Sequence, residues 1–143
     1  MTRIDFYILD STSTQDRYLL SCRIAEKAWK ENHRVMIQTD SEQEARHLDQ
    51  LLWTYRDQSF IPHALLPIAD ASTTPVIIGW NTDAGEESDI LINLSGEVPA
   101  CFSRFERVIE PVDNDPERRA VSRQHYCYYR DRGYPLNDRK IKG

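Results

Sequence analysis

The sequence predicts a single-domain α/β protein whose mostly parallel sheet is flanked by helices. Strand-like and helix-like segments alternate along the first half of the chain, and this alternation is typical of parallel strands joined by crossover helices. Two later segments, residues 75–80 and 89–94, are short and almost continuously apolar. Runs of this kind form strands that are buried on both faces of a sheet.

The first strand is expected at residues 4–9. It is followed by residues 11–14, a cluster of Ser and Thr that is rich in helix N-cap candidates. Residues 15–31 then place four side chains on one helical face: Leu19, Cys22, Ala25 and Trp29. The first helix is therefore expected over this segment.

A second strand is expected at residues 34–38, and a second helix follows it. Ser41 and Glu44 have the spacing of a capping box, in which two side chains satisfy free backbone N–H groups at the start of a helix. This helix is expected to continue through Ala45, Leu48 and Leu52.

The last expected elements are a strand at residues 105–112 and a long helix. Asp115 and Pro116 suit an N-cap with proline at the first helical position, and Gly133 can adopt the left-handed conformation that ends a helix. Residues 70–74 and 81–88 are polar and are expected to be loops. The whole chain, residues 1–143, is interpreted as one domain with a basic helix and tail at residues 116–143.

Length and composition exclude several classes of protein. The 143 residues are 40% hydrophobic and 29% charged, with a mean hydropathy of -0.62, and they include three Trp, seven Tyr and four Phe. This much bulky apolar area argues against disorder, and neither a signal peptide nor a membrane span is expected. Cys22, Cys101 and Cys127 are widely separated and odd in number, which fits reduced thiols in the cytoplasm.

Charge is distributed unevenly along the chain. Residues 117–143 contain eight Lys or Arg and three acidic residues, a net +5, so the first 116 residues carry -10 of the total of -5. A basic end on an acidic body favours a local anion site over a surface that coats nucleic acid. A solvated, charged terminus would give the same pattern.

No nucleotide or metal chemistry is predicted from the motifs. The turn after the first strand lacks glycine, and neither the dinucleotide fingerprint nor the P-loop is present. We therefore expect a Rossmann-like fold without a nucleotide-binding loop, and neither a metal nor a cofactor. Asp10 lies beside hydroxyl residues, where it suits either a phosphoryl-transfer or hydrolytic site or the capping of the first helix.

The last long helix is expected to carry cationic and apolar side chains on different faces. At about 100° per residue, an arc of about 60° holds three cations and one ring: Arg119, Arg123, Tyr126 and Arg130. The face expected to pack on the sheet contains Ala120, Val121 and Tyr128. Guanidiniums around a tyrosine can bind a carboxylate while the ring shelters an apolar group. An ordinary solvated helix face is the alternative.

The turn after the second helix is rich in aromatic residues. Trp53, Tyr55 and Phe60 lie in a short stretch with polar flanks that continues to Pro62. Such residues either anchor a loop to its own core or form a partner surface, in which Trp and Tyr commonly dominate the binding energy.

Short segments along nearly the whole chain also form a recognisable series. They are residues 6–10, Arg34-Val35, Leu52-Trp53, residues 59–63, Pro75-Val76 with Trp80, residues 89–94, Arg123, Tyr126, Tyr129-Arg130, Gly133-Tyr134 and Leu136-Asn137. In order and spacing they resemble the chi-subunit family of the bacterial DNA polymerase III holoenzyme, an accessory part of the clamp-loader assembly. The resemblance implies a protein without a catalytic site of its own that connects other proteins.

The resemblance implies two partners. The first is the acidic C-terminal tail of single-stranded-DNA-binding protein, which ends in Pro-Phe, and its expected pocket contains Arg123, Tyr126, Arg119, Arg130, Val112 and Gly133. The second is the psi subunit of the clamp loader, expected at Trp53, Phe60 and Pro62 with the neighbouring Tyr55. In some family members a helicase takes the place of psi at that surface.

Two residues depart from the family pattern. Cys127 stands where a relative has lysine, and Asp138 stands where a small hydroxyl residue can occur, so a less cationic pocket is expected. The competing functions are an enzyme with a site near Asp10 and a direct binder of single-stranded nucleic acid. The net charge of -5 opposes direct binding of nucleic acid.

Overall fold

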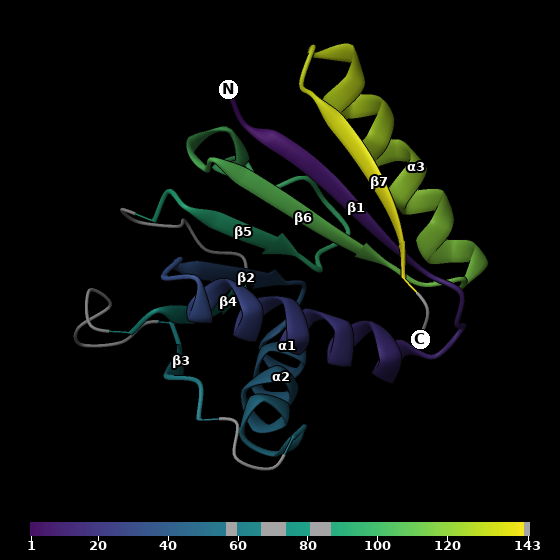
Figure 1. The fold of residues 1–143 in the computed structure, drawn as a ribbon. Helices are drawn as coiled ribbons and strands as arrows, with labels where there is room; N and C mark the ends of the chain where they lie inside the picture. The colour runs from purple at the N-terminus through teal and green to yellow at the C-terminus, as the bar shows by residue number, and fades with distance from the viewer. Residues whose placement is uncertain (57–59, 67–73, 81–86, 142–143) are drawn as a thin grey trace.

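The computed structural model describes residues 1–56, 60–66, 74–80 and 87–141. In this part of the chain, seven parallel strands form one sheet in the order β3-β4-β2-β5-β6-β1-β7 (Figure 1). The strands are β1 (Arg3–Leu9), β2 (Val35–Thr39), β3 (His63–Leu65), β4 (Val76–Trp80), β5 (Ile90–Asn93), β6 (Arg107–Val112) and β7 (Leu136–Ile141). The helices are α1 (Thr14–Lys30), α2 (Glu42–Thr54) and α3 (Pro116–Asp131), with a 3-10 turn, η2 (Phe102–Arg104).

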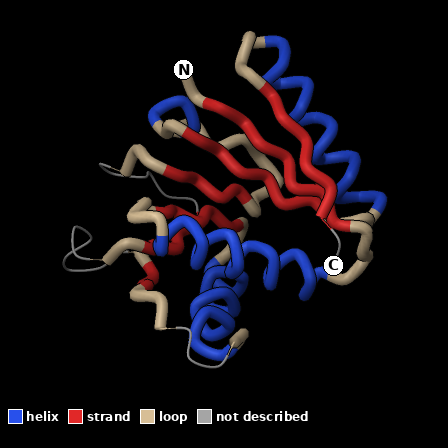
Figure 2. The backbone as a smooth tube through the Cα atoms, in the orientation of Figure 1, coloured by secondary structure: helices blue, strands red, loops and turns tan. Residues whose placement is uncertain are grey.

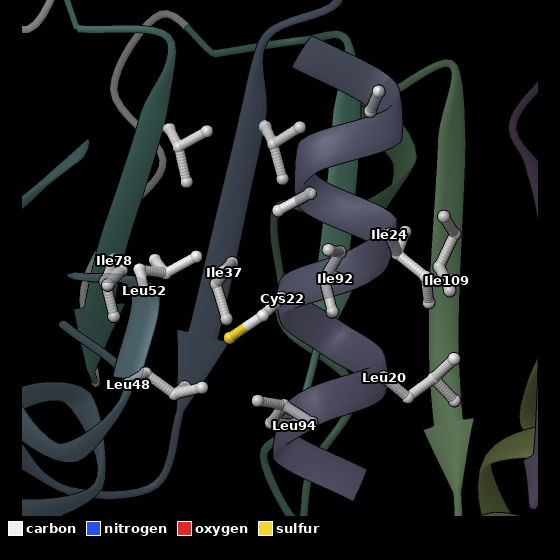
Figure 3. Packing of buried hydrophobic residues seen from close by; sticks show 14 of the residues in the cluster. Leu20, Cys22, Ile24, Ile37, Leu48, Leu52, Ile78, Ile92, Leu94 and Ile109 are labelled. Carbon is white, nitrogen blue, oxygen red and sulfur yellow. The ribbon is translucent and has the colours of Figure 1, made fainter. Parts of the chain in front are cut away.

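Helices cover both faces of this sheet. Helices α1 and α2 lie on one face and α3 lies on the other (Figure 1 and Figure 2). The larger apolar core lies under α1 and α2, where Cys22 is directed toward strands that carry Ile37 and Ile92 (Figure 3). The smaller core includes Phe6 of β1 and Tyr129 of α3. The predicted helix-flanked parallel sheet is confirmed.

The predicted helix ends are also confirmed. The Ser41 hydroxyl accepts a hydrogen bond from the Glu44 N–H at 3.1 Å, while Glu44 Oε1 accepts one from the Asp40 N–H at 3.0 Å. The Asp115 carboxylate accepts one from the N–H three residues later at 3.1 Å, at the start of α3. Beyond the end of α3, Gly133 has a φ of 81°, which a residue with a Cβ rarely adopts.

The sequence analysis did not predict β3 and β7, and both lie at the edges of the sheet. β3 has three residues, all half-buried. In β7 only Leu136 and Ile141 are apolar, and the four residues between them are exposed. Neither segment has the apolar run or the alternation that signals a strand, because an edge strand with a solvated face does not need one.

The expected inner face of α3 is wrong. Ala120 is exposed, and Val121 and Tyr128 are only half-buried. The buried residues of this helix are His125 and Tyr129. Both side chains lie within hydrogen-bond distance of the buried Glu110 carboxylate, and the spacing of apolar residues does not reveal such contacts.

Three further predictions concern thiols, membrane helices and loops. The cysteines are free, with Cys22 buried, Cys101 half-buried and Cys127 exposed. None of the described helices combines the length and apolar character that crossing a membrane requires. Of the two predicted loops, residues 70–73 and 81–86 lie outside the described residues.

Candidate functional site

A hollow of about 260 Å³ lies where α3 meets the edge of the sheet. Four elements line it, and the lining residues are Phe6, Ile8, Val112, Arg119, Ser122, Arg123, Tyr126 and Asp138. Its lining combines apolar side chains with two arginines from α3. The hollow therefore offers a cation and a place for an apolar group side by side.

The strand register brings the floor of this hollow together. Phe6 and Ile8 alternate along β1, so their side chains point to the same face of the sheet. Ile8 is paired with Val112 of β6, and Phe6 is paired with Asp138 of β7. Three parallel strands thus contribute neighbouring side chains to one floor under α3.

Tyr126 closes the apolar side of the hollow. Its ring lies 5.5 Å from the Phe6 ring, centroid to centroid, with an angle of 52° between the planes. The Tyr126 side chain is half-buried rather than turned fully toward solvent. The sequence analysis grouped Tyr126 with three arginines on a face turned away from the sheet. That orientation fits Arg123 and Arg130, which are exposed, but is wrong for Tyr126.

The two arginines are held by backbone carbonyl groups. Arg119 Nε donates to the Asp113 carbonyl at 3.3 Å, and Arg123 Nε donates to the Arg119 carbonyl at 3.4 Å. Among the described residues, no carboxylate lies within salt-bridge distance of either guanidinium. Their charge is therefore not neutralised by an ion pair within the described chain.

A neighbouring arginine of α3, unlike Arg119 and Arg123, is neutralised by an ion pair within the described part of the chain. Arg118 forms a salt bridge with the fully buried Asp113 carboxylate, with 2.6 Å between Nη2 and Oδ2. This hydrogen-bonded carboxylate raises the pKa of Arg118, against the opposing effect of burial. Arg118 thus ties α3 to the loop that precedes it and is not available to a ligand.

Two other predicted pocket residues lie outside the hollow. Arg130 is exposed, and its Nη2 lies 3.2 Å from an Asp131 carboxylate oxygen. Gly133 follows Arg132, the C-cap of α3, and its positive φ lets the chain turn away from the helix. Four of the six predicted residues therefore meet in one place: Val112, Arg119, Arg123 and Tyr126.

Sequence reasoning missed most of the strand contribution to the hollow. Phe6 and Ile8 were assigned to a strand, but only the register and the position of α3 show that they form the floor. Asp138 was noted as a departure from the family pattern, and its place on the lining confirms an acidic group there. Ser122 gave no sequence signal, since serine is common on any helix surface.

A buried polar cluster fastens α3 to β6 beside the hollow. The Glu110 carboxylate is 4% exposed and accepts hydrogen bonds from three side chains: His125 Nδ1 at 2.9 Å, Tyr129 Oη at 2.7 Å and Asn93 Nδ2 at 2.9 Å. Burial and the neighbouring Glu110 carboxylate raise the pKa of Tyr129. Its hydroxyl therefore stays protonated and continues to donate.

The aromatic segment expected after the second helix begins inside α2, which includes Trp53, and forms a second candidate surface. Trp53 is 57% exposed and Phe60 is 74% exposed, although both side chains are large and apolar. Pro62 is exposed as well, whereas Tyr55 is half-buried against the larger core. The Trp53 ring lies 4.5 Å from the His63 ring. Three of the four predicted residues are thus available at the surface.

The alternative site at Asp10 gains no support from its surroundings. Asp10 is exposed, and the adjacent Ser11 hydroxyl donates to Asp16 at 2.6 Å and accepts from the Ser13 N–H. These hydrogen bonds belong to the turn that begins α1. Within the described ranges, no three His, Cys, Asp or Glu side chains are grouped closely enough to hold a metal ion.

A wider hollow of about 890 Å³ lies at the carboxyl ends of β2 and β5. The connections after these strands leave in opposite directions, and this is the position where α/β sheets commonly bind nucleotides. Here the lining includes Asp40 and Glu97. Arg104 lines the same hollow, so the charge there is mixed, and neither strand is followed by a glycine-rich phosphate loop.

Comparison with known proteins assigns this chain to a family. The family described as DNA polymerase III chi subunit, HolC, matches residues 1–137. This chain belongs to that chi family. The DNA polymerase III subunit chi of Pseudomonas aeruginosa is 38% identical over 141 residues, which are 99% of this chain and 98% of that protein.

Further chi relatives match over nearly their full lengths. The subunit of Escherichia coli K12 is 32% identical and the match covers 96% of this chain and 97% of that protein. The subunit of Haemophilus influenzae is 30% identical, with 95% of both chains covered. The family match includes the start of β7 and ends one residue before Asp138. The resemblance inferred from the sequence is confirmed.

Proposed function

We propose that this chi-family chain is a non-catalytic adaptor of the DNA polymerase III assembly, in which the α3 hollow binds the acidic C-terminal tail of single-stranded-DNA-binding protein. The relatives are named as subunits of that polymerase, which supports a role in a protein complex. One observation carries the proposed binding site. Arg119 and Arg123, neither paired with a carboxylate among the described residues, line an apolar hollow.

The chemistry of the tail suits this hollow. A chain that ends in Pro-Phe after several acidic residues presents a terminal carboxylate beside an aromatic ring. Arginine can bind a carboxylate through two parallel hydrogen bonds, and terminal carboxylates are commonly recognised by clustered donors. The phenylalanine ring would contact Phe6, Val112 and Tyr126, which line the apolar part.

The remaining basic residues act on the acidic part of the tail at longer range. Residues 117–143 carry a net +5, which attracts an acidic peptide and orients its approach. Arg130 contributes to this diffuse field, although its pairing with Asp131 weakens it. Gly133 contributes by ending α3 and turning the chain into β7.

The second surface is proposed to bind the psi subunit, or a helicase in its place. Trp53, Phe60 and Pro62 expose apolar area within a short segment, and exposed aromatic residues are enriched among those that dominate protein interfaces. The segment and the α3 hollow belong to different layers of the fold. Both partners could then be bound at the same time.

A tail-peptide titration tests the first interaction. Arg123→Ala should weaken peptide binding by about 2–5 kcal/mol, because one charge-assisted contact is removed. Arg130→Ala is the matched control on the same helix and should change the affinity by less than about 1 kcal/mol. Amidation of the peptide terminus should reproduce the Arg123→Ala loss. Equal effects of the two arginine variants would contradict the proposed site.

Separate measurements address psi and the competing functions. Phe60→Ala should abolish co-purification with psi and leave peptide binding intact; loss of both interactions would indicate misfolding. A mobility assay with bare oligonucleotide should show no binding at physiological salt. Asp10→Ala should leave peptide binding unchanged, and a turnover activity that this variant abolishes would replace the adaptor proposal with an enzyme.

A further inference from the structure

Both ring nitrogens of His125 face oxygen atoms that only accept hydrogen bonds. Nδ1 lies 2.9 Å from Glu110 Oε1, and Nε2 lies 3.0 Å from the Gly96 carbonyl oxygen. A neutral imidazole has one N–H and one lone pair, so it can satisfy only one of these contacts. The other contact would set a lone pair against an oxygen. An imidazolium satisfies both.

The Glu110 carboxyl group has further hydrogen-bond partners beside this ring. Its second oxygen, Oε2, accepts from Tyr129 Oη and from Asn93 Nδ2. Hydrogen bonds donated to a carboxylate favour its charged form. With the His125 contact included, three side-chain groups surround the buried carboxyl group, and each can donate a hydrogen bond to it. This geometry favours a carboxylate beside an imidazolium.

The other charged groups near His125 come from several elements. Arg17 of α1 is a nearby cation, and its guanidinium donates to the Leu94 and Pro111 carbonyls. A hollow of about 270 Å³ beside His125 is lined by further titratable side chains: Tyr18, Asp40, Glu44, Asp115, Glu117 and Arg118. Burial and Arg17 lower the pKa of His125, but the Glu110 carboxylate and the Gly96 carbonyl outweigh them and raise it above its ordinary value.

This pair joins the two sides of the α3 hollow. Glu110 and Val112 are alternate residues of β6 and point to the same face of the sheet. On the helix, His125 directly precedes Tyr126 and follows Arg123 by two residues. A change in how His125 contacts β6 therefore moves the part of α3 that carries the lining arginines relative to the apolar floor.

We propose that His125 and Glu110 form a buried imidazolium–carboxylate pair that positions α3 over the hollow, so that ligand binding there weakens when His125 loses its proton. The inference rests on the proposed function for the identity of the ligand, an acidic peptide tail, but the charge state of the pair can be measured without it. His125 is a positioning residue, since it lies outside the hollow lining.

The direction of the pH effect follows from the pair. A histidine whose pKa is raised on folding contributes its full stabilisation below the ordinary value of about 6.5. That contribution is lost as the pH rises through the folded pKa. The attachment of α3 to β6, and with it tail binding, should therefore weaken as the pH rises above about 6.5.

Nuclear magnetic resonance tests the charge state directly in the protein without ligand. Long-range ¹H–¹⁵N spectra at about pH 7 should show protons on both nitrogens of one histidine ring, assigned to His125 by its absence from His125→Asn. A single proton, on Nε2 alone, would place the other proton on Glu110 and overturn the inference. This result would leave the proposed tail function untouched.

Peptide titrations test the link to the hollow. They use a Cys127→Ser background, so that the exposed thiol of α3 is absent from the measurement. Affinity for the tail peptide should fall by at least about threefold between about pH 6 and about pH 9. His125→Asn, which can still donate to Glu110, should bind with an affinity that no longer depends on pH. In His125→Gln the side-chain amide can donate to the Gly96 carbonyl in place of Glu110. This variant should bind the peptide more weakly than His125→Asn.

The outcomes separate the two proposals. If the peptide does not bind at any pH in this range, the proposed tail function is wrong. The spectra still decide the charge state of His125 in that case. Tail binding that is strong but equally insensitive to pH in the parent and in His125→Asn overturns the positioning role. Circular dichroism of each variant at both pH values shows whether a weak affinity reflects loss of the fold.

Discussion

Asp138 pairs with Phe6 across the parallel β1–β7 ladder, and this register places a carboxylate on the lining of the hollow that Arg119 and Arg123 also line. The acid reduces the positive potential that an anionic peptide meets. Among the described residues, it forms no salt bridge with either arginine. Asp138 is therefore expected to lower the affinity of the proposed site for an acidic peptide.

Replacing this acid should strengthen tail binding. Asp138→Asn removes one exposed negative charge and keeps the size of the side chain, so the affinity for the tail peptide should rise by about 0.2–1 kcal/mol. The gain should shrink at high salt, because exposed charges are screened. Titration calorimetry at two salt concentrations measures both effects. A lower affinity in Asp138→Asn would mean that the carboxylate helps to organise the hollow.

Substitutions at two neighbouring residues of α2 should distinguish loss of psi binding from loss of fold stability. Leu52 is fully buried whereas Trp53 is 57% exposed. Leu52→Ala should lower the free energy of unfolding by about 2–5 kcal/mol. Trp53→Ala should change it by less than about 1 kcal/mol but abolish binding of psi. Denaturant unfolding and co-purification provide the two readouts, and a stability loss of similar size in both variants would show that Trp53 is a core residue.

The Tyr129 hydroxyl should stabilise the fold through Glu110. It donates to the carboxylate at 2.7 Å in a buried setting, and removing a donor from a buried charged acceptor costs about 1–3 kcal/mol. Tyr129→Phe should therefore lower the free energy of unfolding by that amount. Tyr134→Phe is the control, since the Tyr134 hydroxyl has no hydrogen bond within the described part of the chain. Equal stability of the two variants would remove the hydroxyl from the cluster.

Thiol labelling should follow burial and pKa. Burial raises the pKa of Cys22 to about 12, so at neutral pH almost none of this thiol is present as the reactive thiolate. Cys127 is exposed and should react first with a maleimide, while Cys22 should react only after unfolding. Mass spectrometry of the labelled peptides over time distinguishes the sites. Early labelling of Cys22 would show that α1 opens from the sheet in the native state.

The sequence determined the local elements and the chemical types at the candidate sites. Ser41, Asp115 and Gly133 mark helix ends by interactions within a few residues, so their effect does not depend on the rest of the fold. The arginines and Tyr126 of α3 could be grouped from helical spacing alone. The aromatic segment at the end of α2 could be recognised in the same way, from residues that are close in the chain, but its exposure could not.

Tertiary structure alone decided which side chains meet. The floor of the hollow depends on the register of three strands, which brings Phe6, Val112 and Asp138 together across more than a hundred residues of chain. The rotation of α3 depends on a buried carboxylate, Glu110, that binds polar groups of His125 and Tyr129. Hydrophobic periodicity reports only apolar burial, so it could not reveal a helix that is fastened to its sheet by hydrogen bonds.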